Sequence, residues 1–476
     1  MKRDRAKRNN LAKPLILTLN ITLFYLVCHI GYSDSPYKLS LKTAVELAMK
    51  ESKSIQLKEI DFKSADIAYK EEKTNLYPKI DLEASASYLT NPQEGVTIHK
   101  GEFGFAPSVN SQFPIPFPDR DYVLVEDQKH TYFKITAKLT QPLFTWNKIR
   151  NAIEIAGIER DIKFEELKRE RREIEKQVKT LYYSVILSAN SYKELQRIEK
   201  IAEGIVKDKT NSYREGLINL QELLEAKSEL AQVKKKVIEA RESYLTAITS
   251  LKVLTGLTKL KNDTIELTDT FPDKPIALEE GKLVEYAIKT SPEINSMRKK
   301  LAESNKYLSI QKASGPLIPD FSLILTLDIT GQKIPIVGGN WTDYWDKNFI
   351  VTLGTKLKLF DAGQAKYSVE KAEEGVKAAI TGIESYRELI RVKIRKAIEK
   401  LKTNYYTLKE KEAGLKAARE AEKNAEVSYR SELITREKLG KAKMLLISKE
   451  LEYLLALFNY ADSINNVEYL TGKSLR

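Results

Sequence analysis

The side chains that most often carry out catalysis or hold a metal ion are few in this sequence. Its 476 residues include one cysteine, Cys28, and three histidines, His29, His99 and His130. None of the histidines has another ligand at the spacing of a zinc site, and no glycine-rich phosphate loop follows a strand pattern. The many carboxylates alternate with lysines, which indicates solvated helix surfaces. The sequence therefore predicts neither an enzyme nor a protein with a metal or other cofactor.

The chain opens with a basic segment and an apolar run. The run, residues 15–27, has the length of a signal-peptide core and is short for a spanning helix. Gly31 and Ser33 are small residues at the −3 and −1 positions of a cleavage site after Ser33. We therefore expect residues 1–33 to be a signal peptide and the protein to be exported. A lipoprotein acylated at Cys28 and an uncleaved N-terminal anchor are the alternatives, although bulky Val27 stands where an acylation site prefers a small residue.

The rest of the sequence carries one pattern twice. SYREGLINL begins at Ser212 and SYRSELITR at Ser428, an offset of 428 − 212 = 216. The same offset relates two further pairs of dipeptides: Leu143-Phe144 with Leu359-Phe360, and Thr255-Gly256 with Thr471-Gly472. We predict a tandem duplication, with repeat 1 at 34–271 and repeat 2 at 272–476.

Long proline-free tracts predict long helices. All 15 prolines lie at or before Pro335, and none lies between Pro142 and Pro272. Apolar residues then recur at alternating steps of three and four, which is a heptad pattern. In repeat 1 these are Leu223, Ala226, Leu230, Val233, Val237, Ala240, Tyr244, Ala247, Leu251 and Leu254. Before each SYR segment, residues 147–211 and 363–427 predict helices on the order of 100 Å long at 1.5 Å per residue.

Four shorter segments alternate apolar and polar residues with the period of a β-strand. They lie at about 79–90, 132–144, 320–330 and 348–360. Their length suits a tilted strand that crosses a membrane, although an ordinary half-buried antiparallel sheet has the same alternation. Aromatic residues gather at the strand ends, as in membrane barrels: Tyr88, Tyr132, Phe144, Trp146, Trp341, Tyr344, Trp345 and Phe360.

The number of strands bears on the assembly. Four strands cannot close into a barrel, and an open sheet edge has no hydrogen-bond partner in lipid. A membrane barrel would therefore be shared between chains, with 8 strands from two copies or 12 from three. The first hairpin loop, 90–131, is much longer than the second, 331–347. A long loop on one side is the pattern of the outward-facing end of a bacterial barrel, but ordinary variation in loop length is the preferred interpretation.

In several motifs the chain resembles the TolC-type outer-membrane efflux channel family. The motifs are LSLKTAVELAMKESKSI at 39–55, QPLFTWN at 141–147, KLFDAGQ at 358–364, and the Thr-Gly pair that ends each repeat. The resemblance implies an α+β membrane protein. It implies a homotrimer with a 12-stranded β-barrel in the outer membrane and an α-helical tunnel across the periplasm. It also implies a passive channel for efflux of small molecules, working with a periplasmic adaptor and an inner-membrane pump.

The resemblance also assigns a role to the two SYR segments. In the family, each long helix turns near this point at the periplasmic tip, here near 212–219 and 428–435. The residues expected to dock the adaptor are Tyr213, Arg214, Gly216, Leu217, Tyr429, Arg430 and Leu433. Because Glu432 stands where the first copy has Gly216, we expect the second turn to use a different geometry.

A gate is expected beside the tips. The candidate residues are Glu222, Glu225, Tyr429, Lys438 and Lys441. Well-known members of the family narrow this end with acidic rings, whereas lysines would repel cations and attract anions. Solvated helix lysines are the alternative interpretation. A hydrogen bond between Glu222 and Tyr429 would be a modest latch, of order 1 kcal/mol.

Other functions stay open at this point. The same architecture could export a polypeptide in type I secretion, and the channel sequence does not separate the two. A secreted coiled-coil scaffold without a pore is a second alternative. The formal net charge of +13 raises the possibility of a nucleic-acid-binding coiled coil, but the export signal and the amphipathic strands disfavour it.

Overall fold

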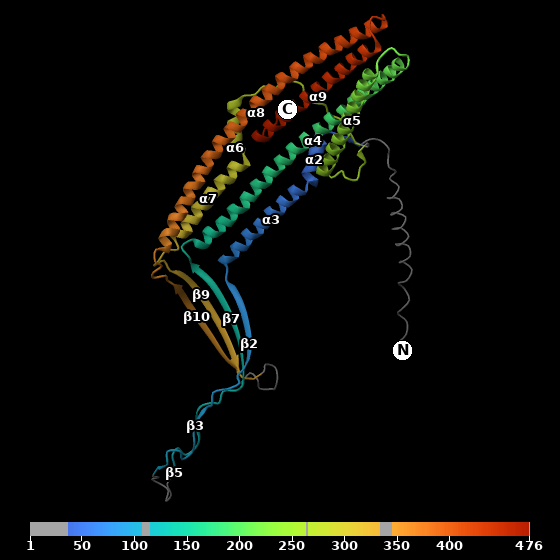
Figure 1. The fold of residues 1–476 in the computed structure, drawn as a ribbon. Helices are drawn as coiled ribbons and strands as arrows, with labels where there is room; N and C mark the ends of the chain where they lie inside the picture. The colour runs from blue at the N-terminus through green and yellow to red at the C-terminus, as the bar shows by residue number, and fades with distance from the viewer. Residues whose placement is uncertain (1–36, 107–114, 263–264, 334–344, 476) are drawn as a thin grey trace, which may run out of the picture. The chain divides into compact units, whose positions relative to one another are not determined.

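The computed structural model describes residues 37–106, 115–262, 265–333 and 345–475 (Figure 1). The expected signal peptide and Cys28 lie outside the described residues, as do Trp341 and Tyr344. None of the described helices is long and apolar enough to cross a membrane.

Eight α-helices of the described residues form two sets of equal lengths. A short pair, α2 (Leu41–Glu51) and α6 (Glu280–Thr290), has 11 residues each. The next pair, α3 (Lys53–Lys73) and α7 (Pro292–Lys312), has 21 residues each. The long helices α4 (Lys148–Arg214) and α8 (Gln364–Arg430) have 67 residues, and α5 (Leu220–Thr255) and α9 (Arg436–Thr471) have 36. The two halves thus place the same elements in the same order.

Local signals set the ends of several helices. The Ser40 hydroxyl accepts a hydrogen bond from the Thr43 amide at 3.1 Å before α2, and the Ser291 hydroxyl caps α7 in the same way. At the other end, α5 stops at Gly256 with φ 74° and α9 at Gly472 with φ 69°. Glycine is needed at residue 472 for a second reason, because a Cβ there would lie 2.6 Å from Nη1 of Arg172.

The four expected strands form one antiparallel sheet in the order β10-β9-β7-β2. The strands are β2 (Lys79–Tyr88), β7 (Thr131–Phe144), β9 (Asp320–Gly331) and β10 (Trp345–Lys356). Strand β10 begins and ends earlier than the expected 348–360, because it pairs with β9 from Trp345 opposite Gly331 to Lys356 opposite Asp320. The outer strands β2 and β10 each have one partner among the described residues.

The register gives the sheet one apolar face and one polar face. One cross-strand row is Leu82, Ala137, Leu327 and Phe349, and the next is Glu83, Thr136, Asp328 and Asn348. In the polar row the Thr136 hydroxyl donates to the Asp328 carboxylate at 2.6 Å, while Leu82 and Phe349 of the apolar row are exposed. An exposed apolar face opposite a polar face is the pattern of a sheet between lipid and water.

The segment expected to be a loop, 90–131, contains further paired strands. Strands β3 (Val96–Ile98) and β6 (Tyr122–Val125) are antiparallel, and so are β4 (Phe105–Ala106) and β5 (Ile115–Pro116). The alternation in this segment is short and is interrupted by prolines and glycines, which explains why the sequence did not reveal these strands.

The chain divides into two compact units, and both halves contribute to each. One unit contains residues up to Ile55, Arg171–Leu283 and Lys393 onward; the other contains Gln56–Glu170 and Val284–Val392. In the first unit, α8 and α9 pack around a core of Ala397, Leu401, Leu408, Ala456, Leu457, Tyr460, Ile464 and Val467.

Buried Tyr182 of α4 anchors a small parallel sheet in the first unit. The sheet pairs β1 (Tyr37–Leu39) with β8 (Ile265–Leu267). The Tyr182 hydroxyl lies 2.9 Å from the Leu39 carbonyl oxygen and 3.1 Å from the Asp269 carboxylate. Burial raises the pKa of Tyr182 to about 12, so the phenol stays protonated and can donate.

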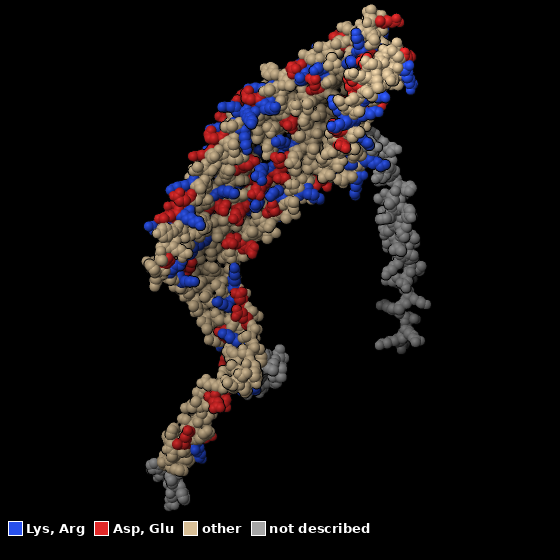
Figure 2. All heavy atoms as spheres, viewed as in Figure 1, with Lys and Arg blue, Asp and Glu red and all other residues tan. Residues whose placement is uncertain are grey.

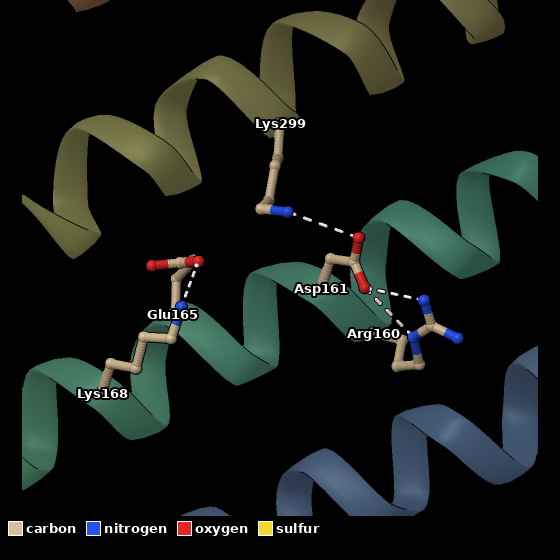
Figure 3. Close-up of polar contacts among 5 residues, drawn as sticks. All are labelled: Arg160, Asp161, Glu165, Lys168 and Lys299. Carbon is tan, nitrogen blue, oxygen red and sulfur yellow. Dashed lines mark hydrogen bonds and ion pairs between the residues drawn. The ribbon is translucent and has the colours of Figure 1, made fainter. Parts of the chain in front are cut away.

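In the second unit, charged side chains join α4 to α7 (Figure 3). Asp161 of α4 accepts from Arg160 at 2.8 Å and pairs with Lys299 of α7 at 3.3 Å. Burial opposes ionisation of Asp161, but the hydrogen bonds from Arg160 and Lys299 outweigh it, so its pKa is lowered. One turn further along α4, Glu165 is only 6% exposed and pairs with Lys168 at 3.0 Å.

Charges of both signs are mixed over the helices on the face drawn in Figure 2. No large area of a single sign appears there. Mixed charge is typical of solvated helix faces, as the sequence predicts, rather than of a surface that binds nucleic acid.

Candidate docking and gating site at the helical hairpin tips

The first hairpin tip is a tight turn of five residues between α4 and α5. The Leu217 amide donates to the Ser212 carbonyl at 2.8 Å, and the Gly216 amide donates to the Tyr213 carbonyl at 3.1 Å. Gly216 has φ 76°, a left-handed conformation that glycine adopts at little cost. The Asn219 side chain then accepts from the Glu222 amide at 2.9 Å and starts α5.

The second tip repeats this geometry. The Leu433 amide donates to the Ser428 carbonyl at 2.9 Å, and the Glu432 amide donates to the Tyr429 carbonyl at 3.0 Å. Thr435 replaces asparagine as the cap of α9 and accepts from the Lys438 amide at 3.3 Å. The two tips therefore share one hydrogen-bond scheme.

The expectation of a different geometry at Glu432 is wrong. Glu432 takes φ 59°, close to the φ of 76° at Gly216. A residue with a Cβ adopts this conformation at a cost of about 1–2 kcal/mol. The hydrogen bonds that close the turn and the cap of α9 offset that cost, so the second tip keeps the shape of the first without a glycine.

The tips present apolar side chains that nothing in the described chain covers. Leu217 is 71% exposed and Leu433 is 77% exposed, and Tyr213 and Tyr429 are exposed one turn before them. Arg214 and Arg430 are the last residues of their helices, and Arg430 pairs with Glu426 at 3.4 Å. An apolar side chain beside an aromatic and a basic residue can bind a protein surface.

The five expected gate residues lie at or just after the two turns. Glu222 and Glu225 belong to the first turns of α5, and Gln221 donates to Glu225 at 3.0 Å. Lys438 and Lys441 occupy the same positions in α9. No hydrogen bond joins Glu222 to Tyr429 among the described residues of the single chain, so that contact stays a prediction.

The two lysines differ in their surroundings. Lys441 pairs with Glu437 at 2.8 Å, and the hydrogen bond that Lys441 donates to this carboxylate raises the pKa of Lys441. Glu437 also lies 3.4 Å from Lys209 of α4. Lys438 is exposed. Lys441 is exposed as well, so the two lysines differ in that the charge of Lys441 is partly offset by Glu437.

The close contact of α9 with α4 was missed from the sequence. A Cβ at Gly440 would lie 3.1 Å from Cδ1 of Ile205 and 3.3 Å from Cγ2 of Ile201, so glycine permits this approach. The first copy has Leu224 at the equivalent position, and its side chain is exposed. A lone glycine within a helical pattern was the available signal.

Ion pairs in the first unit give the lateral order of the long helices. Lys234 of α5 lies 3.1 Å from Glu203 of α4, and Arg197 of α4 lies 3.4 Å from Glu450 of α9. Lys411 of α8 lies 3.3 Å from Glu452 of α9. The row is therefore α5-α4-α9-α8, with α5 and α8 at its ends.

The described residues offer no group of His, Cys, Asp or Glu that could hold a metal ion. His99 and His130 lie in the segment 90–131. The His130 ring lies 2.8 Å from the Leu89 carbonyl oxygen, and His99 lies 3.7 Å from Asp121. Both are thus engaged in local contacts of that segment.

The model of the outer membrane efflux protein family matches residues 44–257. This segment belongs to that family. The resemblance stated from the sequence motifs is confirmed, and so is the outer-membrane location that it implied. Curated proteins gave no match.

Solved structures of outer membrane channels share the fold of nearly the whole chain. The CmeC outer membrane channel of Campylobacter jejuni has a TM-score of 0.72 at 18% identity, with 91% of this chain and 85% of that chain covered. VceC from Vibrio cholerae has a TM-score of 0.66 at 17% identity, with 92% of this chain and 97% of that chain covered. The open MtrE channel of Neisseria gonorrhoeae has a TM-score of 0.66 at 14% identity, with 92% of this chain and 89% of that chain covered. A mostly helical chain with a small sheet is thus the fold of such channels.

Proposed function

We propose that three copies of this chain form a passive duct across the outer membrane and the periplasm. The observation that carries the proposal is the four-stranded sheet, in which β2 and β10 each have one partner among the described residues. The exposed apolar face of the sheet is suited to contact with lipid. An open edge is not stable there, because unpaired backbone N–H and C=O groups are costly in a bilayer. Pairing β2 of one copy with β10 of the next removes every edge, and three copies give a 12-stranded barrel.

The long helices support the same assembly. Helices α5 and α8 are the end members of the row α5-α4-α9-α8, although α2 also contacts α5 and Glu280 of α6 pairs with Arg395 of α8. A ring of copies would bring α8 of one chain beside α5 of the next. A helix of 67 residues is about 100 Å long at 1.5 Å per residue. Such helices would form the wall of a tunnel.

The tips are the proposed docking surface for a periplasmic adaptor, which in turn would engage an inner-membrane pump. Leu217 and Leu433 are the two exposed apolar anchors, and each follows an aromatic and a basic residue. Six such tips from three chains would form a ring at the periplasmic mouth. The duct itself offers no phosphate loop for driving transport, so energy would come from the pump.

The proposed cargo is small molecules, because the family is one of efflux proteins. The experiment is deletion of the gene and measurement of the accumulation of a fluorescent dye in the cells. We expect dye accumulation to rise and to return to normal when the chain is supplied again, while the set of secreted proteins stays unchanged. Loss of one secreted protein with normal dye accumulation would instead indicate type I secretion. If the deletion changes neither dye accumulation nor the set of secreted proteins, the result would favour a scaffold without a pore.

A further inference from the structure

A two-stranded ribbon extends the sheet on the side away from the helices. We call β3 and β6, Val96–Ile98 and Tyr122–Val125, the outer ribbon. It continues the β2–β7 hairpin directly, because the Leu89 amide donates to the His130 carbonyl at 2.6 Å and the Gln128 amide donates to the Gln93 carbonyl at 3.0 Å. The outer ribbon therefore starts at the rim of the sheet (Figure 1).

The outer ribbon exposes apolar side chains on both of its faces. Tyr122 and Val123 are consecutive in the strand and so point to opposite faces. Tyr122 is 42% exposed and Val123 is 60% exposed, and Val96, Leu124 and Val125 are also exposed. An isolated two-stranded ribbon is marginally stable in water at best, so one with two apolar faces needs a partner.

No charged residue lies within the two strands of the outer ribbon. The charges begin beyond them, with Glu94, Glu126 and Asp127 at one end and Lys100, Glu102, Asp119, Arg120 and Asp121 at the other, where the Arg120 guanidinium lies 5.2 Å from the centre of the Tyr122 ring. The strands themselves therefore carry no charge that would repel the strands of a second copy.

We propose that the outer ribbons of neighbouring copies pack against one another through these apolar residues and narrow the outer mouth of the duct. The inference rests on the proposed trimer, in which three ribbons rise from one rim. A ring gives each ribbon a neighbour on two sides, which matches its two apolar faces. A lipid surface would cover only one side.

The test is disulfide cross-linking of trimers purified from the outer membrane. Tyr122→Cys combined with Val123→Cys places one new thiol on each face, so that in a ring the thiol of one copy faces the other thiol of the next, and oxidation is expected to give covalent dimers and trimers on a denaturing gel. Adding Leu124→Asp to this variant is expected to abolish these links, because it places a carboxylate within an apolar contact. The matched control is Lys100→Cys in the charged group, which is expected to stay monomeric, and the unchanged chain reports any link through Cys28.

The outcomes separate this inference from the proposed function. Native mass measurement of the same sample reports the trimer, so a monomeric protein would overturn both proposals. Trimers of the two-cysteine variant in which the new thiols stay unlinked would overturn only the contact between ribbons. A solvent-sensitive fluorophore attached to the thiol of Val123→Cys alone, with an emission that shifts only when vesicles containing lipopolysaccharide are added, would assign the ribbon to lipid and would also overturn that contact.

Discussion

At the scale of single residues, the two tips differ in the residue type at one position that has the same backbone conformation in both. Gly216 and Glu432 have the same left-handed conformation, but only glycine adopts it without a steric cost. We predict that Glu432→Gly raises the free energy of unfolding by about 1 kcal/mol. Gly216→Ala is the matched change in the other tip and is expected to lower the free energy of unfolding by a similar amount. Both are measured by denaturant unfolding, and an unchanged midpoint for the pair would contradict the account of the turns.

A buried ion pair gives a second prediction at this scale. Lys179 of α4 pairs with Glu468 of α9 at 2.9 Å, and the Glu468 side chain is 7% exposed. Lys179→Met leaves that carboxylate without its cation, so we expect a loss on the order of 3 kcal/mol in the free energy of unfolding. Lys235→Met is the control, because Lys235 and Glu239 form an exposed pair whose loss costs about 0.5 kcal/mol or less. Equal effects of the two substitutions would refute the role of Lys179.

Sequence patterns predicted the positions of many site residues but not their partners. The tip residues stood out because SYR occurs twice, and the exposed Leu217 and Leu433 follow it at equal distances. The contacts of Lys179 with Glu468 and of Lys441 with Glu437 depend on which helix faces meet and which rotamers the side chains adopt. A local pattern does not contain that information, so these pairs required the structure.

At the scale of elements, the contact between α4 and α9 depends on Gly440. We predict that Gly440→Leu, which introduces the residue of the first copy, forces the helices apart and lowers the free energy of unfolding by about 1–3 kcal/mol. Gly414→Ala in α8 is the control, because a Cβ there meets no atom within 4 Å and alanine favours the helix by up to about 1 kcal/mol. Circular dichroism during chemical unfolding measures both, and a stable Gly440→Leu variant would contradict the close contact.

The contact between α4 and α7 is expected to depend on pH. The pKa of Asp161 is lowered in the folded chain, so its ion pairs contribute stability above the unfolded value of about 3.8. That contribution is lost as the pH falls through the folded pKa. The thermal midpoint of the unchanged protein should therefore fall more between pH 5 and 2 than that of Asp161→Asn. Glu279→Gln, which removes an exposed carboxylate, serves as the control, and parallel curves for all three proteins would argue against this contribution.

Elements were the scale at which the sequence was most informative. Proline-free heptad tracts predicted the long helices, and α4 and α8 extend only slightly beyond the expected ends near residues 211 and 427. Alternation predicted the four strands of the main sheet. The outer ribbon escaped detection because its strands have three and four residues, fewer than a periodic pattern needs. The order of the helices in their row was also beyond the sequence, since it follows from contacts between distant segments.

At the scale of the whole molecule, the lysines of the second tip are expected to set ion selectivity. We predict that Lys438→Glu shifts the reversal potential of purified trimers toward cation selectivity, because three like charges would surround the mouth. Lys441→Glu makes the same change of charge and should act in the same direction, since it also removes one of the two lysines that pair with Glu437. Lys282→Glu on α6 is the matched charge reversal away from the tips. A lysine ring would be refuted if the unchanged trimer is cation-selective and none of the three substitutions alters its reversal potential.

The central claim is that three chains together complete a hollow duct that one chain cannot form. Single-particle imaging of the detergent-purified protein tests it most directly. We predict a threefold-symmetric particle with a continuous lumen, a barrel in which β2 of one chain pairs with β10 of the next, and six hairpin tips. Single chains or solid helical rods without a lumen would contradict the account.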